Sequence, residues 1–286
     1  MDKVIGLGEM GCRLADELSE HPEYRIYKIG TALKERGTLS IKPHVDMEEY
    51  EKNFDAEEAY IYLRSIKEGD EVLVVTGGGE PINGILLRLM ETIKHAKLNV
   101  LYVCPDRSMM SQIERRDDKI AFKILQEYAR SGILQQMLLV NRSTVEGYVG
   151  EVPIHKYEKS IAHLISYGFA MVNYYNHTTP VLSTSLDTTD WSRITSFGLS
   201  SLDESDGDVK LFFPISEPNS YHFFYGIPAQ MMESDGSLIQ KIKSHVKRYK
   251  TETASASFSV YETTFDDIMV LCTGHTDRIQ DFVSDS

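Results

Sequence analysis

Cysteine is scarce in this chain of 286 residues, and its spacing suggests neither a metal site nor a redox motif. The three cysteines, Cys12, Cys104 and Cys272, stand far apart, and the chain contains no CxxC pair. The nine histidines show no HExxH spacing. These absences argue against a structural zinc site, a disulfide framework and a metal held by protein ligands alone.

The sequence also lacks a surplus of basic residues and any long apolar run. Its formal net charge of -13 provides no general attraction for phosphate backbones or anionic membranes. The first ten residues contain no basic stretch followed by an apolar run, and no segment approaches the roughly 20 apolar residues that span a bilayer. We therefore expect a cytoplasmic protein that binds neither nucleic acid nor membrane directly.

The chain has enough apolar residues for a sizeable core, because 42% of its residues are hydrophobic. In the first half, short apolar runs alternate with segments of helical periodicity. This alternation predicts an α/β domain with a doubly wound, mostly parallel sheet. We expect strands at residues 3–7, 25–30, 71–76, 99–103 and 137–140, and helices at 11–21, 55–66, 85–93 and 119–130.

The second half begins with a long helix, expected at about residues 155–176. The segments after this helix are mostly strand-like. A smaller, mixed α+β domain is expected after about residue 190. Its predicted strands cover residues 209–215, 221–227, 257–263 and 267–273, and its predicted helix covers 237–249. The expected organisation is a nucleotide-binding domain (1–154), a central helix with the loop that follows it (155–190) and a C-terminal domain (191–286).

A glycine loop, Gly6-Leu7-Gly8-Glu9-Met10-Gly11, separates the first predicted strand from the first predicted helix. Glycines at this position let backbone amides approach a phosphate at a helix N-terminus. The same GxGxxG pattern fits a plain tight turn or a dinucleotide site. A dinucleotide site would also carry an acidic residue at the end of the second strand, where Gly30 and Thr31 stand instead. A Rossmann-type NAD(P)-dependent oxidoreductase is therefore a weaker alternative.

A second glycine loop, Thr76 to Gly84 (TGGGEPING), leaves another apolar strand and enters a helix. Two such loops on two strands of one sheet would contact the phosphates of one nucleotide from both sides. Glu80 and Pro81 interrupt this loop. Pro81 removes an amide donor, and Glu80 adds negative charge where a phosphate would lie. Both are also ordinary residues for a helix start, in which case the carboxylate of Glu80 replaces the phosphate.

Further features follow these loops in order: Lys119-Ile120-Ala121-Phe122, a strand-end asparagine at Asn141, the long helix, and Asp187-Thr188-Thr189-Asp190. Together with Gly8 to Cys12 and Gly77 to Gly79, this order resembles the tubulin/FtsZ family, and phage-encoded tubulins most of all. The DxxD stretch is similar to the family's co-catalytic loop. The run Ile194 to Leu199 is similar to the helix that follows that loop.

The resemblance implies binding of GTP or GDP with Mg²⁺, head-to-tail assembly with copies of itself, and GTP hydrolysis that depends on assembly. It places the protein in a bacterial or phage-infected host cell, with an unknown adaptor protein as a further partner. Asp187 and Asp190 would act on the nucleotide of the neighbouring subunit, although helix capping explains them equally well. Nucleotide contacts would come from Gly8, Gly11, Cys12, Gly77, Gly78, Gly79, Asn83 and Gly84, with Asn141 near the sugar and Tyr157 stacked on the base.

Glu80 and Pro81 keep a second interpretation open. They stand where the family continues with a run of glycine and threonine. A nucleotide-free tubulin-like protein with a degenerate glycine loop would retain the fold and serve as a structural or interaction protein.

Overall fold

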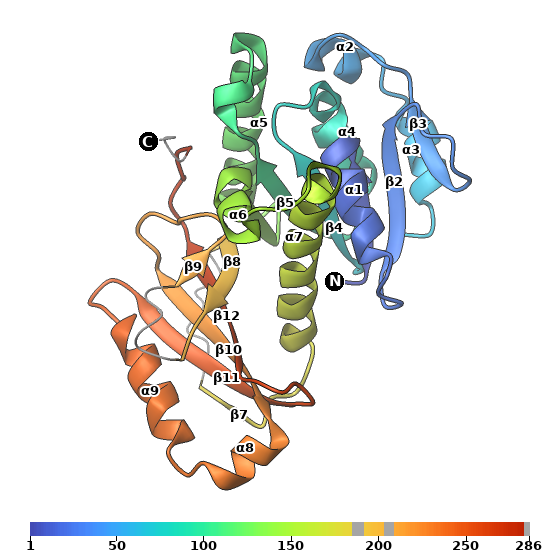
Figure 1. Ribbon diagram of the computed structural model, residues 1–286. Helices are drawn as coiled ribbons and strands as arrows, with labels where there is room; N and C mark the ends of the chain where they lie inside the picture. The colour runs from blue at the N-terminus through green and yellow to red at the C-terminus, as the bar shows by residue number, and fades with distance from the viewer. Residues whose placement is uncertain (185–191, 203–208, 283–286) are drawn as a thin grey trace. The chain divides into compact units, whose positions relative to one another are not determined.

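The computed structural model describes residues 1–184, 192–202 and 209–282 of the chain. The chain divides into two compact units (Figure 1). The first comprises residues 1–167 and the chain end from residue 281, and the second comprises residues 168–280.

A parallel sheet forms the centre of the first unit. Its strand order is β3-β2-β1-β4-β5-β6, and every neighbouring pair in this order is parallel. The central strands are almost completely buried, which explains why they are nearly continuous apolar runs in the sequence. The predicted α/β architecture is confirmed. The strands span Lys3–Leu7 (β1), Arg25–Thr31 (β2), Thr38–Ile41 (β3), Glu71–Gly77 (β4), Lys97–Cys104 (β5) and Gln136–Asn141 (β6).

Helices connect these strands and cover the sheet. Helix α1 packs against β1, β2 and β4, three neighbouring strands of this sheet. The long α7 agrees with the predicted helix almost to the residue. The helices span Gly8–Leu18 (α1), Met47–Lys52 (α2), Ala56–Leu63 (α3), Leu86–Thr92 (α4), Gln112–Ser131 (α5), Arg142–Val149 (α6) and Ile154–Asn176 (α7), with short 3-10 turns at Pro81–Ile85 (η1) and Arg107–Met109 (η2).

Local capping explains where α5 begins and ends. Ser111 and Glu114 form a reciprocal capping box, and Gly132 ends the helix in the left-handed conformation at φ 85°. The helix ends at Ser131, one residue after the predicted end at residue 130. The helix begins seven residues before the predicted Lys119, because the capping box lies upstream of the apolar stripe used to predict it.

The second unit contains a mixed sheet with strand order β8-β12-β10-β11-β7, and β9 pairs with the outer side of β8. Strands β10 and β11 are parallel, and the other pairs are antiparallel. The elements span Leu182–Ser183 (β7), Ile194–Ser200 (β8), Lys210–Leu211 (β9), Ser220–Pro228 (β10), Ala229–Ser234 (α8), Leu238–Arg248 (α9), Ser255–Thr263 (β11) and Met269–Thr276 (β12).

The apolar stripe of α9 supplies one side of this unit's core. Leu238, Ile242 and Val246 recur at helical spacing and pack with Phe223 and Phe258 of the sheet. The basic residues of α9 lie on its exposed side. The predicted helix and the strands on either side of it are confirmed.

Three local predictions were wrong. The run Ile194 to Leu199 is strand β8 and not a helix, because it pairs with β12 and β9 and is buried over Ile194–Gly198. The strand expected at 209–215 is reduced to Lys210–Leu211. Helix α1 begins at Gly8 and not at Gly11, so the first glycine loop consists of the end of β1 and the first turn of the helix.

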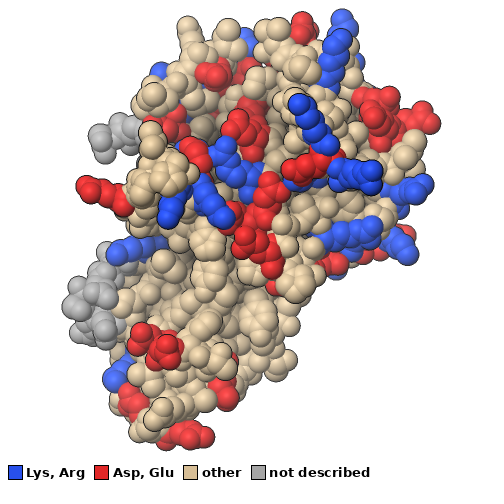
Figure 2. Space-filling view, turned by 45° about the vertical axis from the view of Figure 1, so that its right-hand side comes forward, with Lys and Arg blue, Asp and Glu red and all other residues tan. Residues whose placement is uncertain are grey.

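Charged side chains of both signs lie interspersed on the face shown in Figure 2. Ion pairs such as Lys28–Asp16 at 2.8 Å and Lys241–Asp235 at 2.9 Å fit this mixing. Within the described ranges, no helix is long and apolar enough to cross a membrane.

Candidate functional site

The two glycine loops meet at the carboxyl edge of the first unit's sheet. Strands β1 and β4 are neighbours, with Leu7 opposite Thr76 at their last paired position. The turn into α1 therefore lies beside Gly77 to Gly79, as the sequence predicted. In open parallel sheets, this edge is where ligands bind.

The carboxylate of Glu80 occupies the N-terminus of α1. Its Oε2 accepts a hydrogen bond from the backbone N–H of Glu9 at 2.6 Å, and its Oε1 accepts one from the N–H of Met10 at 3.0 Å. These are the free amides that a phosphate would use at a helix N-terminus. A side chain at Gly8, which has φ 78°, or at Gly77 would collide with this carboxylate.

Burial raises the pKa of Glu80 to about 7, although the Glu9 and Met10 amides act in the opposite direction. The two hydrogen bonds favour the ionised carboxylate, as does the positive end of α1. Desolvation is the larger effect, so the group titrates near neutral pH.

A second carboxylate lies on the other side of the loop. Asp118 of α5 is completely buried, and its Oδ1 accepts a hydrogen bond from Tyr102 at 2.7 Å. A Cβ at Gly78 would collide with this carboxylate. Burial raises the pKa of Asp118 to about 6, against the opposing effects of Tyr102 and Arg107. The triple glycine thus runs between two acidic groups.

Arg107 compensates Asp118 only in part. Its Nε lies 3.5 Å from Asp118 Oδ2, and neither atom has a hydrogen-bond partner in the described structure. The guanidinium is also stacked over the ring of Phe282, 3.8 Å from its centroid. A phosphate beside the triple glycine would therefore meet Asp118 and Glu80 with little free positive charge nearby.

Asn83 and Gly84 hold the end of the second loop in place. Asn83 is buried, donates a hydrogen bond to the carbonyl of Gly77 at 2.7 Å and accepts one from Thr76 Oγ1 at 2.5 Å. Gly84 lies against the backbone of Met47, where a side chain would not fit. These contacts fix the loop in the conformation that directs Glu80 to α1. Both residues were predicted to bind nucleotide, and that role stays a prediction.

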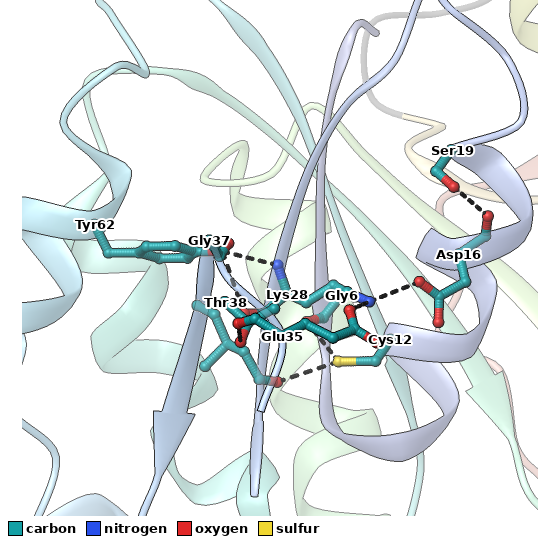
Figure 3. Close-up of polar contacts among 10 residues, drawn as sticks. Gly6, Cys12, Asp16, Ser19, Lys28, Glu35, Gly37, Thr38 and Tyr62 are labelled. Carbon is teal, nitrogen blue, oxygen red and sulfur yellow. Dashed lines mark hydrogen bonds and ion pairs between the residues drawn. The ribbon is translucent and has the colours of Figure 1, made fainter. Parts of the chain in front are cut away.

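Gly11 and Cys12 face the protein interior. Gly11 packs against the carbonyl of Val75, so α1 approaches β4 closely. The Cys12 thiol lies 3.4 Å from the carbonyl oxygen of Gly6 and 3.6 Å from that of Ile29. Figure 3 shows this side chain turned toward the strands. Burial raises the pKa of Cys12 to about 12, which keeps the thiol protonated.

An ion-pair network joins the start of α1 to α6 and α7, and sequence reasoning missed it. Glu158 accepts hydrogen bonds from Arg13 Nη1 at 2.5 Å and Arg142 Nη2 at 2.5 Å. Arg13 also pairs with Glu9 at 2.7 Å, and Arg142 pairs with Glu146 at 2.8 Å. The partners Arg13 and Glu158 are 145 positions apart, so no local pattern indicated the contact.

Asn141 and Tyr157 lie next to this network. Asn141 caps α6, and its Oδ1 accepts a hydrogen bond from the N–H of Thr144 at 2.9 Å. The ring of Tyr157 lies 6.0 Å from the guanidinium carbon of Arg142. Sugar and base contacts by these residues stay predictions.

The predicted catalytic pair, Asp187 and Asp190, lies outside the described residues. Neither their role in hydrolysis nor their capping alternative is tested by the geometry. In the part of the chain that the structure describes, no group of three or more His, Cys, Asp or Glu side chains could hold a metal ion. The present arrangement does not fit a nucleotide phosphate, since the amides of Glu9 and Met10 already bind Glu80.

Comparisons with known proteins identify the fold. CetZ2 from Haloferax volcanii, solved as a GTPγS-bound protofilament, matches with a TM-score of 0.73 and 14% identity over 96% of this chain and 92% of its own. An empty FtsZ dimer from M. jannaschii matches with a TM-score of 0.69 and 11% identity, over 96% of this chain and 87% of its own.

A GTPγS-form protofilament of TubZ from Bacillus thuringiensis serovar israelensis matches with a TM-score of 0.69 and 13% identity, over 97% of this chain and 86% of its own. No protein-family model and no curated protein sequence matches the chain. The chain therefore has the tubulin/FtsZ fold over nearly its whole length, as the sequence motifs predicted.

Proposed function

We propose that this chain is a tubulin/FtsZ-like filament protein that assembles head to tail with copies of itself and does so without a bound nucleotide. One observation carries the nucleotide-free part: Glu80 binds the Glu9 and Met10 amides at the N-terminus of α1. Assembly is supported by the likeness to CetZ2 and TubZ, both solved as protofilaments. A heterologous contact that does not close into a ring extends into an open filament.

A phosphate that entered this site would have to displace Glu80. To reach the α1 N-terminus it would break two hydrogen bonds to a carboxylate, each contributing roughly 1.5–3 kcal/mol when the acceptor is charged. The displaced Glu80 would then lie close to a further negative charge, with Asp118 on the opposite side of the loop. Closure by Glu80 gives α1 the anion that its N-terminus favours and leaves nucleotide unnecessary for folding.

The first experiment combines sedimentation and electron microscopy of the purified chain with calorimetric titration of GTP and GDP, each with and without Mg²⁺. We expect filaments without added nucleotide and no heat of nucleotide binding. Glu80→Ala removes the carboxylate and frees both amides, and it should gain at least tenfold in affinity for GDP. Glu80→Gln keeps the size of the side chain but loses its charge and one of its two acceptor oxygens, and it serves as the control for side-chain volume. Absence of filaments at every concentration would overturn the proposal.

A second candidate is an assembly-dependent GTPase of the same fold. It is favoured by the meeting of the two glycine loops at one sheet edge, with Leu7 opposite Thr76. In this version the Glu80 side chain moves away from α1 when the nucleotide binds. The glycines and Asn141 contact the nucleotide. Asp187 and Asp190 act on the nucleotide of the neighbouring subunit. The relation to phage-encoded tubulins belongs to the same hypothesis.

Two measurements separate the candidates. Micromolar binding of GTP by the native chain, with turnover lost in Asp187→Ala or Asp190→Ala, would establish the GTPase and reject the nucleotide-free version. A change in nicotinamide fluorescence on mixing with NADH would instead support the oxidoreductase alternative.

A further inference from the structure

A cavity of about 260 Å³ lies between α2, η1, α4 and α5 of the first unit, and Glu80 is not among its lining residues. Its walls come from helices on either side of the short 3-10 turn, and Figure 1 shows α2, α4 and α5 around this region. The lining residues are Asp46, Met47, Glu48, Glu51, Asn83, Gly84, Leu86, Leu87, Arg116, Asp117, Ile120, Ala121, Ile124 and Leu125.

The floor of the cavity is apolar and fixed. Leu86, Ala121 and Leu125 are buried, and Leu87 lies half-buried beside them. The wall formed by Asn83 and Gly84 is held by the hydrogen bonds of Asn83 to Thr76 and Gly77 and by the tight packing of Gly84 on α2. A preformed apolar cavity with a few polar groups is the common form of a small-molecule site.

The charged part of the lining is mostly acidic. Four carboxylates and one guanidinium are among the lining residues. The guanidinium, on Arg116, is already paired with Asp117, its Nη2 lying 2.9 Å from Oδ1. Glu48 and Glu51 stand three positions apart on α2, are exposed, and form no ion pair within the described residues. Two carboxylates without an ion-pair partner therefore line the cavity, and the Arg88 guanidinium lies near one of them through its hydrogen bond to the Glu51 carbonyl at 2.8 Å.

We propose that this cavity binds a small organic cation, namely a protonated amine with an apolar aromatic or aliphatic body. The body lies on the apolar floor, and the ammonium group lies between Glu48 and Glu51. An anion of the same size is repelled by these two carboxylates, and a neutral molecule gains only the apolar contact.

Three probes of matched shape test the ligand class: 2-phenylethylamine, 2-phenylethanol and 3-phenylpropionate. Methyl NMR of the native chain would follow Met47, Leu87, Ile120 and Ile124 during each titration. We expect saturable shifts of these methyls, with the amine binding about fivefold more tightly than the alcohol and the carboxylate binding most weakly. This estimate follows from two partly exposed charge pairs. The preference for the amine should shrink as salt is added.

Two variants and one control test the assigned residues. Glu48→Gln with Glu51→Gln should weaken the binding of the amine about fivefold and leave the binding of the alcohol unchanged. Glu57→Gln with Glu58→Gln removes two carboxylates of α3 outside the cavity and should change neither. Ile120→Trp fills the cavity from a side chain that is 48% exposed, so the fold tolerates it, and should abolish binding of both probes. Equal affinity for all three probes, or no shift at the four methyls, would reject the proposal.

Discussion

Glu80 acts at the residue scale as an internal anion for the helix that follows β1. Its two oxygens bind the amides of Glu9 and Met10, and glycines at positions 8 and 77 leave room for it. Burial opposes ionisation, while the amides and the helix end favour it. The net result is a carboxyl group whose pKa lies near 7. Glu80 therefore gains or loses its proton within the physiological pH range.

The pH dependence of stability should carry the signature of Glu80. Its pKa is about 7 in the folded chain and 4.5 in the ordinary state, so the folded state holds the proton more tightly. The contribution of Glu80 to stability is therefore complete below pH 4.5 and is lost as the pH rises through 7. In urea unfolding between about pH 5 and 8, the stability of the native chain relative to Glu80→Gln should fall by about 2 kcal/mol, allowing for partial exposure to solvent.

Subtracting the variant's curve removes the effects of other titrating groups, including Asp118 and the buried histidines. Glu68→Gln is the matched control, because Glu68 is an exposed carboxylate remote from the loop. Its curve should run parallel to that of the native chain. A constant gap between the native chain and Glu80→Gln across the pH range would show that Glu80 does not titrate as described.

At the scale of helices and strands, local pattern was a good guide wherever burial is periodic. Strands β4 and β5 are continuous apolar runs, and α9 has an apolar stripe of Leu238, Ile242 and Val246. The helix expected at Ile194 to Leu199 rested on the family resemblance and was wrong, because this run is β8, a strand buried between two neighbours. Gly198 of this strand lies against the backbone of Lys210, where a side chain would not fit.

The candidate site, too, was predictable from the sequence only in part. The two glycine loops and the alternative role of Glu80 were predictable, because each lies within one strand-to-helix turn. Asp118 and the network of Arg13, Arg142 and Glu158 were not, since their partners come from elements far apart in the chain. Long-range pairs leave no periodic trace in the sequence.

The close packing of α1 on β4 gives a prediction for a single helix. Gly11→Ala would place a methyl group on the carbonyl oxygen of Val75, and overpacking of this kind typically costs about 1–3 kcal/mol. Gly147→Ala in α6 is the matched control, because no atom lies within 4 Å of a Cβ there and the residue is exposed. It should gain about 0.5–1 kcal/mol. Chemical unfolding of both variants measures the difference, and equal stabilities would contradict the packing argument.

At the scale of the whole molecule, net charge sets the conditions for the proposed assembly. Each subunit carries a formal charge of -13, so every copy added to a filament is repelled by those already present. Local ion pairs across an interface oppose this repulsion, but they involve few residues and are weak when exposed. The long-range repulsion extends over about 10 Å at 0.1 M salt and shortens as salt is added.

The critical concentration for assembly should therefore fall as ionic strength rises. Between roughly 50 and 300 mM KCl we expect a decrease of several fold, measured as the protein remaining in the supernatant after sedimentation. Lowering the pH from about 8 to 6.5 at constant salt should act in the same direction, because it reduces the net negative charge.

A single charge reversal tests the same argument without a change of buffer. Glu68→Lys replaces an exposed carboxylate with an ammonium group and makes the net charge less negative by two. It should lower the critical concentration at low salt and have little effect at high salt, where the repulsion is already screened. A critical concentration that rises with salt would mean that ion pairs between subunits outweigh net repulsion, and the basic side of α9 would then be the first surface to examine by charge reversal.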